Sequence, residues 1–325
     1  MMNVHPMWNE YPALRDELAA TLSLIEQHLT INNRDVQDKI KEMLASGGKL
    51  LRPAYTLLFS QFATDRNVEK SRALAAAVEV LHMATLIHDD VIDESATRRG
   101  QDTLNTAYSN RVAVYTGDYL FTVCFGLLQD YVTDSNEVPL NTKGMETILI
   151  GELNQMSRKY AVNMRMRDYL SQVKGKTAQL FALSCYSGAY QANDRIARQA
   201  YQIGSNIGMA FQIMDDILDY SETGAVIGKP AMQDVRNGIY TAPLLYAMQT
   251  HKKKIEPYLL KGAAISDSEV QEVLELVKEA GGIEKARTLA EKYTNKALKQ
   301  INQLPENQVK ITISRISEQM LARKF

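Results

Sequence analysis

Two short acidic motifs carry the clearest chemical signal in this chain of 325 residues. Each motif reads Asp-Asp-x-x-Asp, and each follows a strongly apolar stretch, at 78–87 and at 207–214. Carboxylates avoid apolar surroundings unless opposite charge compensates them, so the motifs indicate an internal site for divalent metal ions. The six residues are Asp89, Asp90, Asp93, Asp215, Asp216 and Asp219.

Helical spacing would place the first and last aspartate of each motif on one face, one turn apart. Like charges in that arrangement destabilise a bare helix, and burial increases the cost. Mg²⁺ binds carboxylate oxygens and keeps waters or phosphate oxygens as its other ligands. Two facing helices would therefore hold Mg²⁺ with a diphosphate across the motifs. The alternative is a pair of solvated helix ends, which two matched motifs behind apolar stretches disfavour.

The composition bounds the class of protein. Apolar residues make up 45% and charged residues 23%, as in ordinary globular proteins, and a net charge of −1 argues against nucleic acid as a partner. Cys124 and Cys185 lie in apolar segments, so we expect free, buried thiols in a reducing, cytoplasmic compartment. No basic run precedes an apolar N-terminal core, and no stretch of about 18 apolar residues occurs. We therefore expect neither a signal peptide nor a membrane span.

The apolar pattern is helical nearly throughout, and no linker-like composition divides the chain. We therefore expect one all-α domain over 1–325. Glycines and prolines, Pro257 among them, mark the expected breaks, and we interpret the basic run at 251–254 as a solvated loop. The predicted helices span 9–30, 34–45, 53–62, 68–93, 108–131, 141–160, 166–191, 194–220, 241–250, 268–280, 282–302 and 307–322.

A diphosphate needs cations, and basic residues cluster near the breaks. Lys49 and Arg52 lie on a glycine turn that enters a helix, where backbone N–H groups add to the positive field. Arg98 and Arg99 follow the first motif closely, and the planar guanidinium suits phosphate oxygens. The alternative is a plain turn and a surface arginine pair with solvated charges.

Three further polar residues are candidates for contacts near the motifs. Lys176 stands among apolar helix positions and needs an anion or a route to solvent, and Lys229 follows the second motif in a glycine-proline loop. His82 precedes Asp89 by two helical turns, so it is either a core histidine or a ligand contact.

The order GGKxxRP, HxxxLIHDDxxD, RRG, KT, FQxxDDxLD and GK, over about 45–245, resembles the all-trans polyprenyl diphosphate synthase family. The similarity is greatest to medium- and long-chain bacterial members, including component II of heptaprenyl diphosphate synthase. The resemblance implies the isoprenoid synthase fold, an antiparallel helix bundle around a deep central cavity. It also implies Mg²⁺, isopentenyl diphosphate, an allylic diphosphate (farnesyl diphosphate is expected), a homodimer and, in some members, a small accessory subunit.

The resemblance also implies a role for each matching residue. Asp89, Asp93, Asp215 and Asp219 match the metal-binding carboxylates, and Arg98 matches the contact to the allylic diphosphate. Isopentenyl diphosphate would be bound by Lys49, Arg52, His82 and Arg99, with Phe211 as an aromatic neighbour. The groups around the allylic diphosphate and the nascent cation would be Lys176, Thr177, Gln212 and Lys229.

Three positions depart from the family pattern. Leu50 stands where arginine is frequent, Met232 where a second loop glycine is usual, and Ile239 where the family often has lysine. These changes affect the expected diphosphate affinity rather than the fold, and they leave room for a chain that works poorly without a partner subunit.

The implied chemistry is ionisation of the allylic diphosphate, attack by isopentenyl diphosphate and loss of a proton. Product length would depend on the residues below the first motif, because short-chain members often carry aromatics there. Ala84 and Thr85 are small and Leu81 lies deeper, so we expect a product of about C30–C40. The alternative is that small residues here only allow close helix packing.

Two other functions remain open at this point. A class I terpene cyclase uses one diphosphate, which would leave Lys49, Arg52 and Arg99 without a ligand. A non-catalytic stabilising subunit commonly loses one acidic motif, whereas this chain keeps both.

Overall fold

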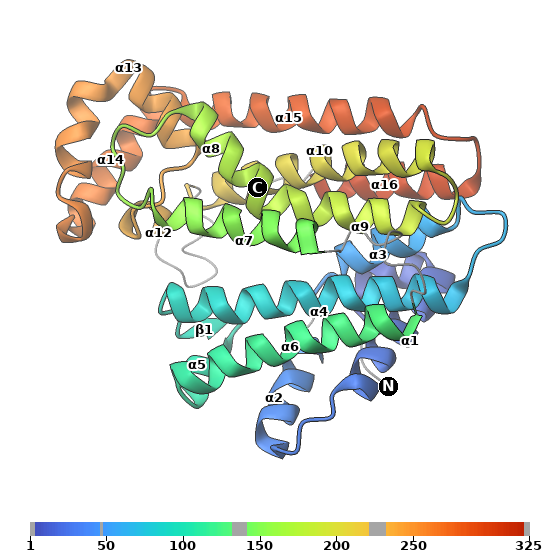
Figure 1. The fold of residues 1–325 in the computed structure, drawn as a ribbon. Helices are drawn as coiled ribbons and strands as arrows, with labels where there is room; N and C mark the ends of the chain where they lie inside the picture. The colour runs from blue at the N-terminus through green and yellow to red at the C-terminus, as the bar shows by residue number, and fades with distance from the viewer. Residues whose placement is uncertain (1–3, 46–47, 132–141, 221–231, 322–325) are drawn as a thin grey trace. The chain divides into compact units, whose positions relative to one another are not determined.

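The computed structural model describes residues 4–45, 48–131, 142–220 and 232–321, and most of them are helical (Figure 1). The predicted all-α class is confirmed. Among the described residues the only sheet is a short hairpin, in which β1 (Thr97–Arg98) pairs antiparallel with β2 (Gln101–Asp102).

The chain separates into two compact units. Unit 1 consists of Met1–Asn141 and Leu183–Tyr201, and unit 2 consists of Thr142–Ala182 and Gln202–Phe325. Helices α9 (Gln179–Ala189) and α10 (Asp194–Leu218) contribute residues to both units. The prediction that 1–325 form a single domain stays a prediction.

Unit 1 is built around α4 (Val68–Ile92), which packs against α1 (Pro12–His28), α3 (Leu51–Ser60) and α6 (Asn110–Tyr131). Figure 1 shows α4 and α6 running side by side. The side chain of Asn67 caps α4 by accepting from the Lys70 N–H, and a run of buried alanines lets neighbouring helices approach. The remaining elements are η1 (Pro6–Glu10), α2 (Arg34–Ala45) and α5 (Leu104–Ala107).

Unit 2 holds a long core in which α13 (Ala242–Leu259) packs against α14 (Asp267–Glu279) and α15 (Gly282–Ile301). Its chain begins with α7 (Thr142–Met156) and α8 (Met166–Val173), and α8 continues through one π-helical turn, η3 (Lys174–Ala178), into α9. The remaining elements are α12 (Gln233–Arg236), η4 (Gly262–Ala264) and α16 (Gln308–Leu321).

Most predicted helices are present within a few residues, but the region after 241 differs. The predicted loop at 251–254 is wrong, because α13 continues through it with a kink at His251 and also passes Pro257. The lysines there are nevertheless exposed, as expected. The sequence also did not predict the hairpin, the π turn or the short helices η1, α5 and α12.

Two other predictions concern thiols and membranes. Cys124 and Cys185 are free and buried, as expected. In the described part of the chain one helix, α6, is long and apolar enough to cross a membrane, and 44% of the relevant window is buried. One such helix is weak evidence for a span, because a core helix has the same composition.

Candidate active site

The first acidic motif ends α4. Asp89 and Asp93 stand one turn apart, and the Asp93 N–H donates to the Asp89 carbonyl at 2.8 Å. Asp93 is exposed and Asp89 is half-buried. The two predicted metal ligands of unit 1 therefore lie on the last turn of one helix, at its solvent-accessible end.

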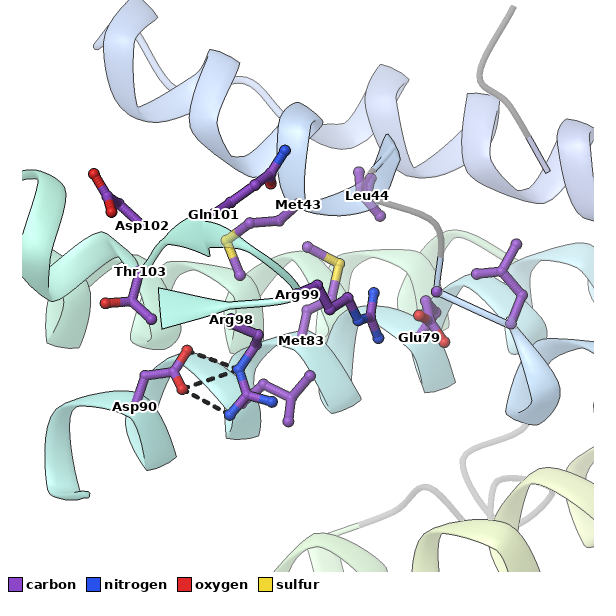
Figure 2. A pocket seen from close by; sticks show the side chains of 13 residues that line it. Met43, Leu44, Glu79, Met83, Asp90, Arg98, Arg99, Gln101, Asp102 and Thr103 are labelled. Carbon is purple, nitrogen blue, oxygen red and sulfur yellow. Dashed lines mark hydrogen bonds and ion pairs between the residues drawn. The ribbon is translucent and has the colours of Figure 1, made fainter. Parts of the chain in front are cut away.

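The middle aspartate of this motif has a different environment. Asp90 is 3% exposed, and its carboxylate accepts three hydrogen bonds from Arg98, at 2.9 and 3.0 Å from Nε and 2.6 Å from Nη2 (Figure 2). Burial lowers the pKa of Arg98, but the bonds to Asp90 and the nearby negative charge outweigh it and raise the pKa. Arg98, predicted to contact the allylic diphosphate, is thus held beside the predicted metal ligands Asp89 and Asp93.

The hairpin explains why the side chains of the adjacent Arg98 and Arg99 lie in different places. Its two turn residues, Arg99 and Gly100, have φ of +52° and +79°, as a two-residue type I′ turn requires. Arg98 therefore lies on the strand and Arg99 at the tip. A Cβ on Gly48 would lie 2.8 Å from Arg99 Nη1, so a larger residue there would displace the guanidinium.

A pocket in unit 1 lies beside this hairpin. Leu50, Glu79, Met83, Arg98 and Arg99 contribute to its lining (Figure 2). Leu50 has φ of +49° and is 6% exposed, so at this departure from the family pattern an apolar side chain forms part of the pocket wall.

Arg52 and His82, both predicted to bind isopentenyl diphosphate, meet in unit 1 at 3.0 Å from Nη1 to Nε2. Arginine has no acceptor, so His82 Nε2 accepts and the ring proton lies on Nδ1. Burial, followed by the charges of Arg52, Arg99 and Arg98, lowers the pKa of His82 well below its usual value. His82 is therefore neutral and available to orient Arg52.

Glu79 completes this group, and the sequence reasoning missed it. Burial raises the pKa of its carboxyl, while the charges of Arg52 and Arg99 act in the opposite direction. The signal was a charged residue within an apolar helix, three positions before His82. Lys49 is exposed, and its carbonyl accepts from Trp8 Nε1 at 2.8 Å, which anchors the backbone at this residue.

In unit 2 a π-helical turn carries the predicted Lys176 and Thr177. π turns occur mostly as single insertions and often at functional sites. A Cβ on Gly151 would lie 2.9 Å from the carbonyl carbon of Gly175, so the glycine in α7 lets the two backbones touch. This contact brings α7 side chains close to the π turn.

Lys176 uses that proximity. Its Nζ lies 2.8 Å from Glu152 Oε2 and 3.1 Å from Gln155 Oε1. Neither α7 residue was predicted, and the pair gave no distinct signal, because the helix also carries Glu146 and Asn154. Lys176 is 29% exposed in its side chain, so it combines a fixed position with access to solvent.

In the second acidic motif, as in the first, the middle aspartate is buried and accepts hydrogen bonds from neighbouring side chains. Asp216 is 5% exposed and accepts from Tyr169 OH at 2.5 Å and from Gln212 Nε2 at 2.8 Å. Gln212 Oε1 in turn accepts from Thr177 Oγ1 at 2.6 Å. Burial raises the pKa of Asp216 to about 7, against the two hydrogen bonds, which lower it. The predicted Thr177 and Gln212 therefore meet; Tyr169 gave no sequence signal.

Asp219, predicted as a metal ligand, also has a structural task. Its carboxylate oxygens accept the N–H groups of Gln233 and Asp234, both at 3.1 Å, at the start of α12. Its carbonyl accepts from Met232, whose φ of +58° explains why glycine is usual at that position. Lys229 lies outside the described residues. Asp215 is half-buried on α10, one turn before Asp219.

The remaining predicted residues concern the substrate chain. Phe211 packs against Phe181 with ring centroids 5.4 Å apart. Ala84 and Leu81 are almost completely buried, whereas Thr85 is only partly buried and donates to the His82 carbonyl at 2.8 Å. Of the three positions predicted to set product length, Thr85 is therefore the most exposed to solvent.

The carboxylates suit Mg²⁺ in chemistry, since hard oxygen donors from one or two side chains leave positions for waters and phosphate oxygens. In the regions that the structure describes, no cluster of three or more histidine, cysteine, aspartate or glutamate side chains could hold a metal alone. The predicted ligands belong to different units, with Asp89 and Asp93 in unit 1 and Asp215 and Asp219 in unit 2. Each pair would supply two carboxylates.

Comparison with known proteins then decides the family. Residues 33–280 match the family model described as polyprenyl synthetase. The chain belongs to the polyprenyl synthetase family. It is accordingly a prenyltransferase of isoprenoid biosynthesis with the all-α isoprenoid synthase fold, and the family joins allylic diphosphates to isopentenyl diphosphate.

The relatives of this polyprenyl synthetase differ in product. It is 33% identical to heptaprenyl diphosphate synthase component 2 of Bacillus subtilis (strain 168), over 97% of this chain and 90% of the relative. A geranylgeranyl pyrophosphate synthase structure from Lactobacillus brevis ATCC 367 has a TM-score of 0.93 and 38% identity, over 98% and 99% of the chains. A polyprenyl synthase from Caulobacter crescentus CB15, complexed with calcium and isoprenyl diphosphate, has a TM-score of 0.88 and 28% identity, over 96% of each chain.

Proposed function

We propose that this prenyltransferase extends farnesyl diphosphate with successive isopentenyl diphosphate units to an all-trans polyprenyl diphosphate of about C30–C40, with Mg²⁺ as cofactor. The observation that supports this most directly is the cationic group of unit 1, in which Arg52 bonds His82 and the charge of Arg99 acts on the His82 pKa. A terpene cyclase, which binds a single diphosphate, would have no use for this second cationic group.

The first step of the proposed reaction is ionisation of the allylic diphosphate. Asp89, Asp93 and Asp215, with Asp219, would hold Mg²⁺, which when bound neutralises the diphosphate as a leaving group. The bond between the allylic carbon and the diphosphate oxygen breaks, and its electron pair leaves with the diphosphate. The resulting cation must be kept from water until the next step.

The π-electrons of isopentenyl diphosphate then form the new carbon–carbon bond, and a proton passes to the released diphosphate. Lys176 orients the leaving group, while the oxygens of Thr177 and Gln212 stabilise the positive charge as fixed dipoles. Arg52 and His82 keep the second diphosphate in place.

Two features support a product beyond C20. Thr85 is small and partly exposed one turn below Asp89, which leaves room for a growing tail. The relative from Bacillus subtilis is named as a heptaprenyl synthase. We also propose a homodimer in the cytoplasm, where the free buried thiols of Cys124 and Cys185 would stay reduced.

The proposal is tested with the purified chain, farnesyl diphosphate, labelled isopentenyl diphosphate and Mg²⁺, followed by mass spectrometry of the products. We expect labelled all-trans products centred on about C30–C40. A C20 product would overturn the chain length, and conversion of farnesyl diphosphate without label would overturn the condensation.

A second candidate is a catalytic subunit that is inactive alone. It is favoured by the printed name "component 2" of the Bacillus subtilis relative. The same assay, repeated with a small accessory subunit from such a two-component system, separates the two: activity only in the mixture supports the second candidate.

A further inference from the structure

Three side-chain hydrogen bonds within unit 2 form a continuous chain that ends at Thr177. Tyr169 OH donates to Asp216 Oδ2 at 2.5 Å, Gln212 Nε2 donates to Asp216 Oδ1 at 2.8 Å, and Thr177 Oγ1 donates to Gln212 Oε1 at 2.6 Å. The four residues come from α8, the π turn and α10.

The chain has a fixed direction. A glutamine amide has a donor end and an acceptor end, and Asp216 binds the donor end. Gln212 must then present its acceptor oxygen to Thr177. A threonine hydroxyl has one proton, and Thr177 donates it in the hydrogen bond to Gln212. Only the lone pairs of Oγ1 therefore remain for any further neighbour.

The surroundings hold this arrangement rigidly. Tyr169 is 3% exposed and Thr177 is 7% exposed. Tyr169 belongs to the main core of unit 2, together with Ile213 and Ile217 of the same α10 helix. Burial, then the charge of Asp216, raises the pKa of Tyr169 well above its usual value, so its hydroxyl keeps the proton that it donates.

We propose that Tyr169 and Asp216 are positioning residues that orient the Gln212 amide, so that Thr177 presents an oxygen with only lone pairs to the allylic cation. The inference rests on the prenyl transfer proposed above. An oriented dipole stabilises developing charge without reorganisation, whereas a hydroxyl free to rotate would turn its proton toward or away from the cation.

The decisive variant is Tyr169→Phe, which removes one hydroxyl and leaves the ring in the core. Tyr220→Phe is the matched control, because Tyr220 is also buried in this core and its hydroxyl is bonded to Thr241 instead. We expect Tyr169→Phe to lower kcat on the order of tenfold, less than the loss of a direct oxyanion donor, with the KM values changed less than about twofold. Tyr220→Phe should leave both unchanged.

A binding measurement separates positioning from a structural role. The probes are an allylic diphosphate analogue with a protonated amine at the cationic carbon and its uncharged carbon isostere, each titrated with Mg²⁺ by calorimetry. Transition-state mimics report interactions made only with the developing charge. We expect Tyr169→Phe to reduce the amine-to-isostere affinity ratio about tenfold and Tyr220→Phe to leave it unchanged.

Gln212→Leu is close to isosteric, adds no charge and removes the acceptor that orients the Thr177 hydroxyl, so it should lower the same ratio if Tyr169→Phe does not fold. A normal ratio in whichever of the two variants folds, whatever its melting temperature, would overturn the proposal. Wild-type protein that binds both analogues but transfers no prenyl group would instead overturn the proposed function.

Discussion

Asp90 and Asp216 occupy the same place in their motifs and meet the same physical problem, a carboxylate that points into a protein core. Asp90 accepts three bonds from Arg98, and Asp216 accepts from Tyr169 and Gln212. An unpaired buried carboxylate would be costly, so both partners satisfy it. The second aspartate of each motif therefore fixes the position of a neighbouring polar side chain, Arg98 in one case and Gln212 in the other.

His82 gives a pH prediction at this scale. Its pKa is lowered in the folded state, so the unfolded chain binds more protons as pH falls through about 6.5. Folding stability carried by neutral His82 is therefore present above that pH and declines below it. We expect His82→Gln, which keeps an acceptor for Arg52, to be less stable than wild type at pH 7.5 and to approach it at pH 5.5.

Urea unfolding of both proteins at the two pH values measures this difference. Glu79 acts in the opposite sense, since its raised pKa favours the folded state as pH falls, but it is common to both proteins and cancels. A stability difference that stays constant with pH would contradict the assignment of a depressed His82 pKa.

At the scale of elements, the contact between α7 and the π turn decides where Lys176 lies. Gly151→Ala would place a Cβ 2.9 Å from the Gly175 backbone, which cannot yield as a side-chain end can. We expect a loss of about 1–3 kcal/mol in the free energy of unfolding, together with lower kcat, because Lys176 moves away from Glu152.

The matched control is Gly126→Ala on α6, where an added Cβ meets nothing within 4 Å. Alanine is the better helix former, so this variant should be more stable by about 0.5–1 kcal/mol. Thermal denaturation and steady-state kinetics measure both variants. Equal effects at the two glycines would show that close backbone approach is not the cause.

The helix that bears the first motif also predicts product length. Thr85→Phe adds an aromatic ring at a partly exposed position one turn below Asp89 and should shorten the product by at least one isoprene unit. Ala84→Phe should instead lower stability, because Ala84 is fully buried and the ring overpacks the core. Product chromatography and melting curves test both; an unchanged product in a stable Thr85→Phe variant would exclude this position.

At the scale of the whole molecule, the prediction concerns the Mg²⁺ that the two acidic motifs are proposed to bind. We expect chelation to abolish prenyl transfer and added Mg²⁺ to restore it. Asp215→Ala should raise the Mg²⁺ concentration needed for half-maximal rate. Asp219→Ala should lower stability by about 1 kcal/mol, because its carboxylate caps α12.

Activity titrated with Mg²⁺ and thermal melts of the two variants provide the test. If Asp219→Ala leaves the melting temperature unchanged and only shifts the Mg²⁺ dependence, the capping role is contradicted. If neither variant shifts the Mg²⁺ dependence, the second motif does not bind metal.

The sequence by itself determined the helical class, most helix bounds and the family, because apolar periodicity and short motifs are local properties. It also named the residues of the Arg52–His82 pair and of the Thr177–Gln212 pair, although not their bonds. The errors of the sequence-based prediction after residue 241 arise because local patterns do not report tertiary packing. Packing lets α13 continue through a basic run and past Pro257.

The tertiary structure alone decided which partners those residues have. Glu79, Glu152, Gln155 and Tyr169 act through contacts with groups far along the chain or on a neighbouring helix turn, and no local pattern specifies such contacts. The same holds for Asp219, whose carboxylate caps a helix that begins fourteen residues later. A motif names the donor atoms, but only packing decides which of them are already occupied.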